Sequence, residues 1–181
     1  MACVAVKSAL FVSLSVYGLA AAQVAKPGAD WDALIARTKK FASDDRPSEA
    51  AKVASEALLV AEERFGPSHV RTGISALFLA RAEFSTGDLH QAAFHYERAL
   101  SAFERHAKSM NRLLGATALE LAVTYLKLEQ PIAAVKCLER SIKVLQQTLG
   151  PDHPDITQSQ NLLAETYSRL SKYDKVLPLC G

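Results

Sequence analysis

Five histidines are the residues of this chain best suited to metal binding or proton transfer. They are His69, His90, His95, His106 and His153. A helical metal site needs two histidines three or four positions apart, so that both face the same ion, and no pair in this set has that spacing. His90 and His95 are five positions apart, which places them on different faces of a helix.

Sequence motifs of other catalytic sites are absent. No glycine-rich loop follows a predicted strand, as phosphate binding would require, and no Gly-x-Ser-x-Gly occurs. The adjacent acids Asp44–Asp45 and Glu62–Glu63 belong to polar stretches, which we expect to be solvated surface. The sequence therefore predicts no catalytic residue, no metal site and no cofactor, and enzymatic activity would require a further domain.

The three cysteines are Cys3, Cys137 and Cys180. Cys3 falls in the expected signal peptide described next. For Cys137 and Cys180 two alternatives stay open: a disulfide, which an exported protein would tolerate, or two small buried apolar side chains. Two thiols are too few for a zinc cluster.

The amino-terminal segment 1–22 has the pattern of a secretory signal peptide. Lys7 precedes an uncharged, mostly apolar stretch at 8–22, and Ala20 and Ala22 form a small-x-small cleavage site before Gln23. The apolar stretch is shorter than the ~20 residues that span a bilayer, and the alternative is an uncleaved membrane anchor. We expect an exported protein, periplasmic or secreted, with no membrane span after cleavage and a short linker at 23–29.

The composition favours helices that bury a core. The net charge of +2 argues against a dedicated nucleic-acid binder and against a disordered chain. Alanine and leucine are abundant, glycine is scarce, and alternating runs of β-branched residues are missing. The predicted fold class is therefore all-α.

One interval recurs throughout the chain. Small residues repeat every 42 residues in two columns. The first column is Ala80, Ala122 and Ala164, and the second is Ala50, Ala92 and Ala134. A period of this size indicates one supersecondary unit that repeats. Two helices can cross closely only where side chains are small, and each helix pair leaves an apolar face that the next pair covers.

Turn and cap residues divide the chain into units. We expect repeats at about 31–69, 70–111 and 112–153, and an incomplete one at 154–181. Asp30 and Asp88 are predicted helix caps, and Pro47 and Pro131 are predicted first-turn residues. Gly66-Pro67 and Gly150-Pro151 mark turns between units, and the turn between the second and third units is expected at Lys108-Ser109.

These residues resemble the tetratricopeptide repeat. Leu121-Ala122-x-x-Tyr125, followed by Ala134, Leu138 and Ile142, is similar to the family pattern, and the 42-residue period resembles its kinesin-light-chain type. The resemblance implies an α-α superhelix of about three and a half repeats that binds proteins on a concave face. It also implies a structural role for His69 and His153 in the turns between units. The second unit departs from the pattern at Glu83, where an aromatic residue is expected and Phe84 could compensate.

The expected peptide-binding groove lies on the first helix of each unit. Its predicted residues are Ile74, Leu77, Arg81, Phe84, Leu119, Val123, Leu126, Lys127, Asn161, Glu165, Ser168 and Arg169. Asn161 is expected to bind the backbone of the peptide, since asparagine on this face often does so in the family. The alternative is that Leu77, Phe84 and Leu119 pack inside the stack.

The carboxyl end suggests a second kind of association. Tyr173, Val176, Leu177 and Leu179 belong to a half-built helix that Pro178 interrupts, where a solenoid normally ends in a polar capping helix. Either the chain is a truncated form or this edge pairs with another copy. The sequence thus predicts a non-catalytic adaptor or assembly scaffold with a protein partner, and the alternative is a structural homo-oligomer.

Overall fold

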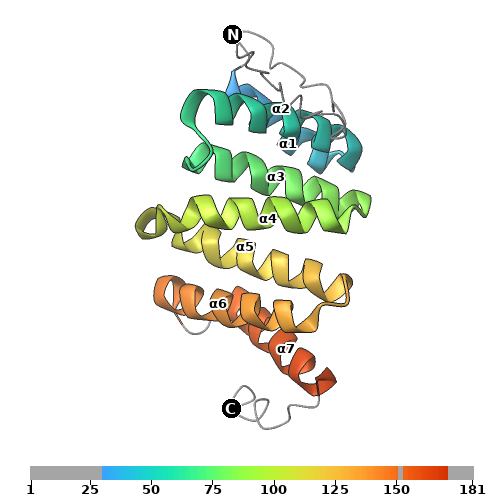
Figure 1. The fold of residues 1–181 in the computed structure, drawn as a ribbon, viewed down its shortest axis with the longest axis vertical. Coiled ribbons are helices and arrows are strands. Elements are labelled where there is room, and N and C mark those ends of the chain that lie inside the picture. The colour runs from blue at the N-terminus through green and yellow to red at the C-terminus, as the bar shows by residue number, and fades with distance from the viewer. Residues whose placement is uncertain (1–29, 151–152, 171–181) are drawn as a thin grey trace, which may run out of the picture.

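The computed structural model describes residues 30–150 and 153–170, and these residues form helices and no strand. The helices are α1 (Trp31–Ser43), α2 (Pro47–Phe65), α3 (Val70–Thr86), α4 (Leu89–Glu104), α5 (Ala107–Lys127), α6 (Pro131–Leu149) and α7 (Pro154–Arg169). Each helix packs against its neighbours in the chain, and α1 also contacts α3. The helix pairs therefore stack along one axis, which confirms the predicted all-α solenoid (Figure 1).

Several expectations concern other parts of the chain. The signal peptide at 1–22, the linker at 23–29, Cys3, Cys180 and the half-built helix at 171–181 lie outside the described residues.

The ends of the helices follow the predicted caps. The Asp30 carboxylate accepts a hydrogen bond from the Asp32 amide at 3.2 Å, and Asp88 accepts one from the Gln91 amide at 3.4 Å. Pro47 and Pro131 are the first residues of α2 and α6. These positions suit proline because the first amide of a helix has no acceptor within the helix.

One backbone conformation ends the first helix of each of the first three pairs. Asp45, Gly87 and Glu129 occupy the same position of successive units and have φ values of 54°, 89° and 58°. A residue in the left-handed region reverses the chain directly after a helix, which lets the second helix fold back onto the first. Only the second of these three units has glycine at this position, the residue that adopts the left-handed conformation without steric cost.

The alanine columns lie where the helices meet. Ala80, Ala92, Ala122 and Ala134 have no exposed surface and Ala50 is 1% exposed, whereas Ala164 on α7 is partly exposed. Leucines fill the space beside them, as Leu58 and Leu100 do in the central core cluster. The periodic pattern of small residues thus reports close helix packing, as predicted.

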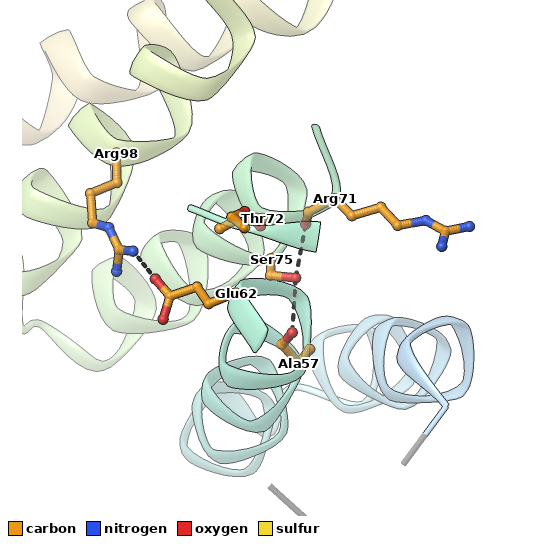
Figure 2. A network of polar contacts seen from close by, with 7 residues as sticks. Ala57, Glu62, Arg71, Thr72, Ser75 and Arg98 are labelled. Atoms are coloured by element: carbon orange, nitrogen blue, oxygen red, sulfur yellow. Dashed lines mark hydrogen bonds and ion pairs between the residues drawn. The ribbon is translucent and has the colours of Figure 1, made fainter. Parts of the chain in front are cut away.

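Polar contacts also repeat along the stack. Glu62 pairs with Arg98, and Glu104 pairs with Arg140 one unit later. Figure 2 shows the first of these pairs beside Ser75, whose hydroxyl is 3.3 Å from the Ala57 carbonyl oxygen and 3.0 Å from that of Arg71. The Glu–Arg pair thus joins consecutive helix pairs at the same register at two successive junctions.

The predicted turn at Lys108-Ser109 is wrong. Both residues lie in the first turn of α5, which begins at Ala107, before the expected start of the third unit at about 112. The chain turns instead at Arg105 and His106, between α4 and α5. The segment holds no glycine or proline before Gly115, so nothing prevents the helix from starting earlier.

Candidate functional site

The first helices of the pairs form a hollowed face. A pocket of about 430 Å³ opens between α3 and α5, and we call it the α3–α5 pocket. Residues of α3, α4, α5 and α7 line it: Arg81, Phe84, Ser85, Tyr96, Ala116, Leu119, Glu120, Val123, Asp155 and Gln158. Three successive helix pairs therefore contribute to one surface.

An ion pair crosses this pocket from α3 to α5. The Arg81 guanidinium donates to both Glu120 carboxylate oxygens, with the Nε–Oε2 distance at 2.8 Å. The hydrogen bond to Glu120 raises the pKa of Arg81, so the guanidinium stays charged. Burial, followed by the Glu120 charge, raises the pKa of Tyr96, whose side chain lines the pocket as a neutral phenol.

Aromatic rings hold further cations on this face. The Lys127 ammonium lies 4.7 Å from the centre of the Phe84 ring. Lys39 and Arg81 both lie over the Phe78 ring, at 5.4 Å and 5.8 Å. A cation over a ring face is attracted by the ring quadrupole, which orients the long side chain without neutralising its charge.

A second pocket continues the hollow toward the amino-terminal end. It encloses about 300 Å³ between α1 and α3, and Thr38, Lys39, Asp45 and Phe78 are among its lining residues. Arg81 and Ser85 line both pockets. The two pockets are therefore adjacent, and together their lining comes from all four units.

The structure brings together part of the predicted groove. Arg81, Phe84, Leu119 and Val123 all line the α3–α5 pocket. Leu119 is only 7% exposed and also belongs to a core cluster, so it serves as the apolar floor. Lys127 reaches the same region through its contact with Phe84.

Other predicted residues lie away from the pocket. Leu77 is 2% exposed and packs in the core, as the alternative interpretation held. Ile74 and Leu126 are partly buried against core clusters. The predicted α7 residues Asn161, Glu165, Ser168 and Arg169 are exposed and are not among the lining residues.

Sequence reasoning missed five of the residues that line the pocket, Ser85, Tyr96, Ala116, Glu120 and Asp155. Ala116 stands one period after Ile74 and one period before Gln158, so the repeat itself could have located it. Glu120 could have been found as the residue one turn before Val123. Tyr96 reaches the pocket from a second helix, which the restriction to first helices excluded.

His69 and His153 cap helices. Each Nδ1 accepts a hydrogen bond from the amide two residues later, at 3.1 Å from Arg71 and 3.2 Å from Asp155. The two histidines thus play the structural role that the sequence resemblance implied. Within residues 30–150 and 153–170, no three His, Cys, Asp or Glu side chains gather to hold a metal ion. In the same ranges no helix is long and apolar enough to cross a membrane.

Solved structures share this architecture. TPR-like repeats of a kinesin light chain from Podosopora anserina superpose with a TM-score of 0.70 at 22% identity, over 82% of this chain and 70% of that one. BtubC from P. vanneervenii gives 0.74 at 18% identity, over 82% and 59%. MamA gives 0.64 at 14% identity, over 86% and 76%. At such identities these similarities show the fold.

A sequence model of the family supplies the assignment. It is described as tetratricopeptide repeat and matches residues 41–105 and 113–179. No curated protein matches the chain. The matched segments cover more than half of the sequence and include α2, α3, α4, α6 and α7 in full, so the chain belongs to the tetratricopeptide repeat family.

Proposed function

We propose that this chain is a non-catalytic adaptor or scaffold whose α3–α5 pocket holds a segment of a partner protein. The observation that carries the proposal is the composition of the pocket. An apolar wall of Phe84, Leu119 and Val123 stands beside the Arg81–Glu120 pair, on helices fixed by packing. Binding surfaces of this kind combine apolar area with a few placed polar groups that set orientation.

The partner segment is an extended or helical peptide with one or two apolar anchors. One anchor packs against Phe84 and Val123, and a second reaches Phe78 in the adjoining pocket. Backbone groups of the peptide meet Gln158 at the pocket edge, and Asn161, exposed one turn further along α7, binds the backbone beyond it. The two pockets share Arg81 and Ser85, and this adjacency supports a segment that crosses both.

The proposed site of action is outside the cytoplasm. The proposal rests on the apolar stretch at 8–22 and the small residues Ala20 and Ala22 before Gln23. Expression in a bacterium should yield an exported chain that begins at Gln23, as amino-terminal sequencing of the exported fraction would show. A membrane-bound chain that keeps Lys7 would instead support the uncleaved anchor.

Peptide display against the purified chain tests the binding site. Selected peptides should lose affinity about tenfold or more on Val123→Arg, because the new charge would be buried against the apolar anchor. Val123 is half-buried, so the substitution keeps the core intact. Lys136→Glu is the matched control, since Lys136 is exposed on α6 and takes no part in the pocket. Equal affinities for Val123→Arg and the unaltered chain would exclude this site.

A further inference from the structure

One column of the repeat changes its residue type in the second unit. Phe41, Glu83, Tyr125 and Tyr167 occupy the same position of successive units. Tyr125 packs against two core clusters, and its hydroxyl donates to Glu97. Tyr167 is 3% exposed, and its hydroxyl donates to Glu139. In the third and fourth units an aromatic ring on the first helix therefore fills the space between that helix and the second helix of the preceding unit.

Glu83 leaves this space without a ring. Its carboxylate lies 2.7 Å from His95 Nδ1, and both side chains are largely buried, at 14% and 12% exposure. Ser55 takes the position that corresponds to Glu97 and Glu139. Phe84 does not compensate for the missing ring, because it lines the α3–α5 pocket on the other side of α3.

An open pocket marks the place of the missing ring. It encloses about 580 Å³ between α2 and α4, and we call it the α2–α4 pocket. Its lining combines leucine side chains with both signs of charge: Ala51, Lys52, Ser55, Glu56, Leu58, Leu59, Glu62, Leu79, Glu83, His95 and Arg98. Its second-helix residues and Glu83 set it apart from the pocket proposed for peptide binding.

A large apolar side chain stands at the rim of this pocket. Phe94 on α4 is 53% exposed, although it is a phenylalanine in a well-packed helix. Its ring lies 5.1 Å from the His95 ring and 5.8 Å from the Arg98 guanidinium, and both of those residues line the pocket. The equivalent residue one unit later is Lys136, so the exposed ring is specific to the unit that has the open pocket.

We propose that two copies of this chain pair through this surface, with Phe94 of each copy in the α2–α4 pocket of the other. A projecting ring beside a pocket that lacks one is self-complementary, which is what a two-fold interface requires. The charges agree, because Lys52 on one copy can face Glu56 on the other, while Arg98 and Glu62 stay paired within each chain. This interface goes beyond the proposed peptide binding and leaves the α3–α5 pocket open.

Sedimentation of the purified chain at concentrations up to about 100 µM, high enough to populate weak interfaces, tests the pairing. The chain should form dimers, and Phe94→Ser should weaken self-association about tenfold or more. Ile132→Ser is the matched control, because Ile132 is 63% exposed on α6 and lies outside the pocket. It should leave the dimer unchanged.

A second variant fills the pocket from within. Glu83→Tyr together with Ser55→Glu restores the tyrosine–glutamate pair of the later units, and it should weaken self-association as well. Circular dichroism would establish that each variant keeps its helices. A chain that stays monomeric at every concentration would overturn the proposal. So would a dimer that Phe94→Ser leaves intact, or one that Ile132→Ser weakens equally.

Discussion

Two helical glycines lie against large side chains of the next helix. A Cβ at Gly115 would stand 2.5 Å from the Leu145 side chain, and one at Gly73 would stand 2.9 Å from Phe103 and Ala102. Phe103 and Leu145 are themselves one period apart, so each glycine provides room for the same kind of contact. Glycine is the residue that allows these helices to approach so closely.

Gly115→Ala should therefore destabilise the chain. In a free helix the change would stabilise by about 1 kcal/mol, because alanine is the better helix former. Here the added methyl group overpacks against Leu145, which costs about 1–3 kcal/mol. Urea unfolding measures the sign of the change, and combining the substitution with Leu145→Ala should remove the clash. A gain in stability for Gly115→Ala alone would contradict the packing.

Cys137 should react slowly in the folded chain. Burial, with a further contribution from Glu97, raises the pKa of its thiol from 9.0 to about 11. Thiolate is the reactive form, so at pH 8 the folded chain holds about a hundredfold less of it than the unfolded chain. The same shift lowers stability as pH rises above 9.0, because the unfolded chain loses the proton first.

Thiol labelling at pH 8 measures the reactivity of Cys137 in a folded chain that carries Cys180→Ser, so that Cys180 does not react. Fast labelling of the folded chain would contradict the burial of Cys137. Cys137 carries a free thiol in the structure, and labelling of the unaltered chain, denatured without reductant, tests whether it pairs with Cys180. Free thiols at Cys137 and Cys180 would both react, whereas a disulfide would protect both.

At the scale of helices, a buried hydroxyl at the same position of the repeat makes different contacts in successive units. The Ser75 hydroxyl accepts a hydrogen bond from Trp31 Nε1 at 2.8 Å and lies within reach of two backbone carbonyls, which ties α3 to α1 and α2. The equivalent residue of the next unit is Thr117, whose buried hydroxyl has no hydrogen-bond partner among the described residues.

Loss of the hydroxyl should lower the free energy of unfolding at Ser75 but not at Thr117. Ser75→Ala leaves the buried Trp31 N–H without an acceptor and should cost about 1–3 kcal/mol. Thr117→Val keeps the shape and removes an unsatisfied polar atom, so its effect should be neutral or stabilising. Denaturant unfolding of both variants measures the contrast, and equal destabilisation would contradict the hydrogen-bond assignment.

Helix positions were predictable where the sequence carries a strong local signal. Asp30, Asp88, Pro47 and Pro131 define helix starts by chemistry that needs no tertiary contact. The start of α5 was not predictable in this way, because His106 provides no side-chain cap and the residues after it suit a helix equally well. The prediction of a turn at Lys108-Ser109 rests on analogy with the other units, and α5 begins earlier than that analogy predicts.

The groove residues show why faces are harder to predict than helices. Successive residues of a helix point about 100° apart, so an error of one position exchanges a groove residue for a core residue. Leu77 was assigned to the groove and lies in the core, whereas Glu120 was omitted and lies in the pocket. The contribution of Tyr96 depends on packing between pairs, which the period alone does not encode.

At the scale of the whole molecule, the described helices pack mainly against their neighbours in the chain, and ion pairs such as Arg81–Glu120 and Glu62–Arg98 join helices of consecutive pairs. Such a stack offers two broad faces, and the described residues hollow both of them. The face formed by the first helices holds the α3–α5 pocket proposed for a peptide. The face formed by the second helices holds the α2–α4 pocket proposed for a second copy of this chain. Because the pockets lie on different sides of α3, partner binding and dimerisation can occur together.

Methyl NMR of the chain with a display-selected peptide tests the central claim most directly. The account predicts that the largest shift changes occur at Ala116, Leu119 and Val123, which line the α3–α5 pocket. Ile132, exposed on α6 away from that pocket, should not respond. Shift changes centred on Ile132 or on the second helices, with Val123 unaffected, would contradict the account.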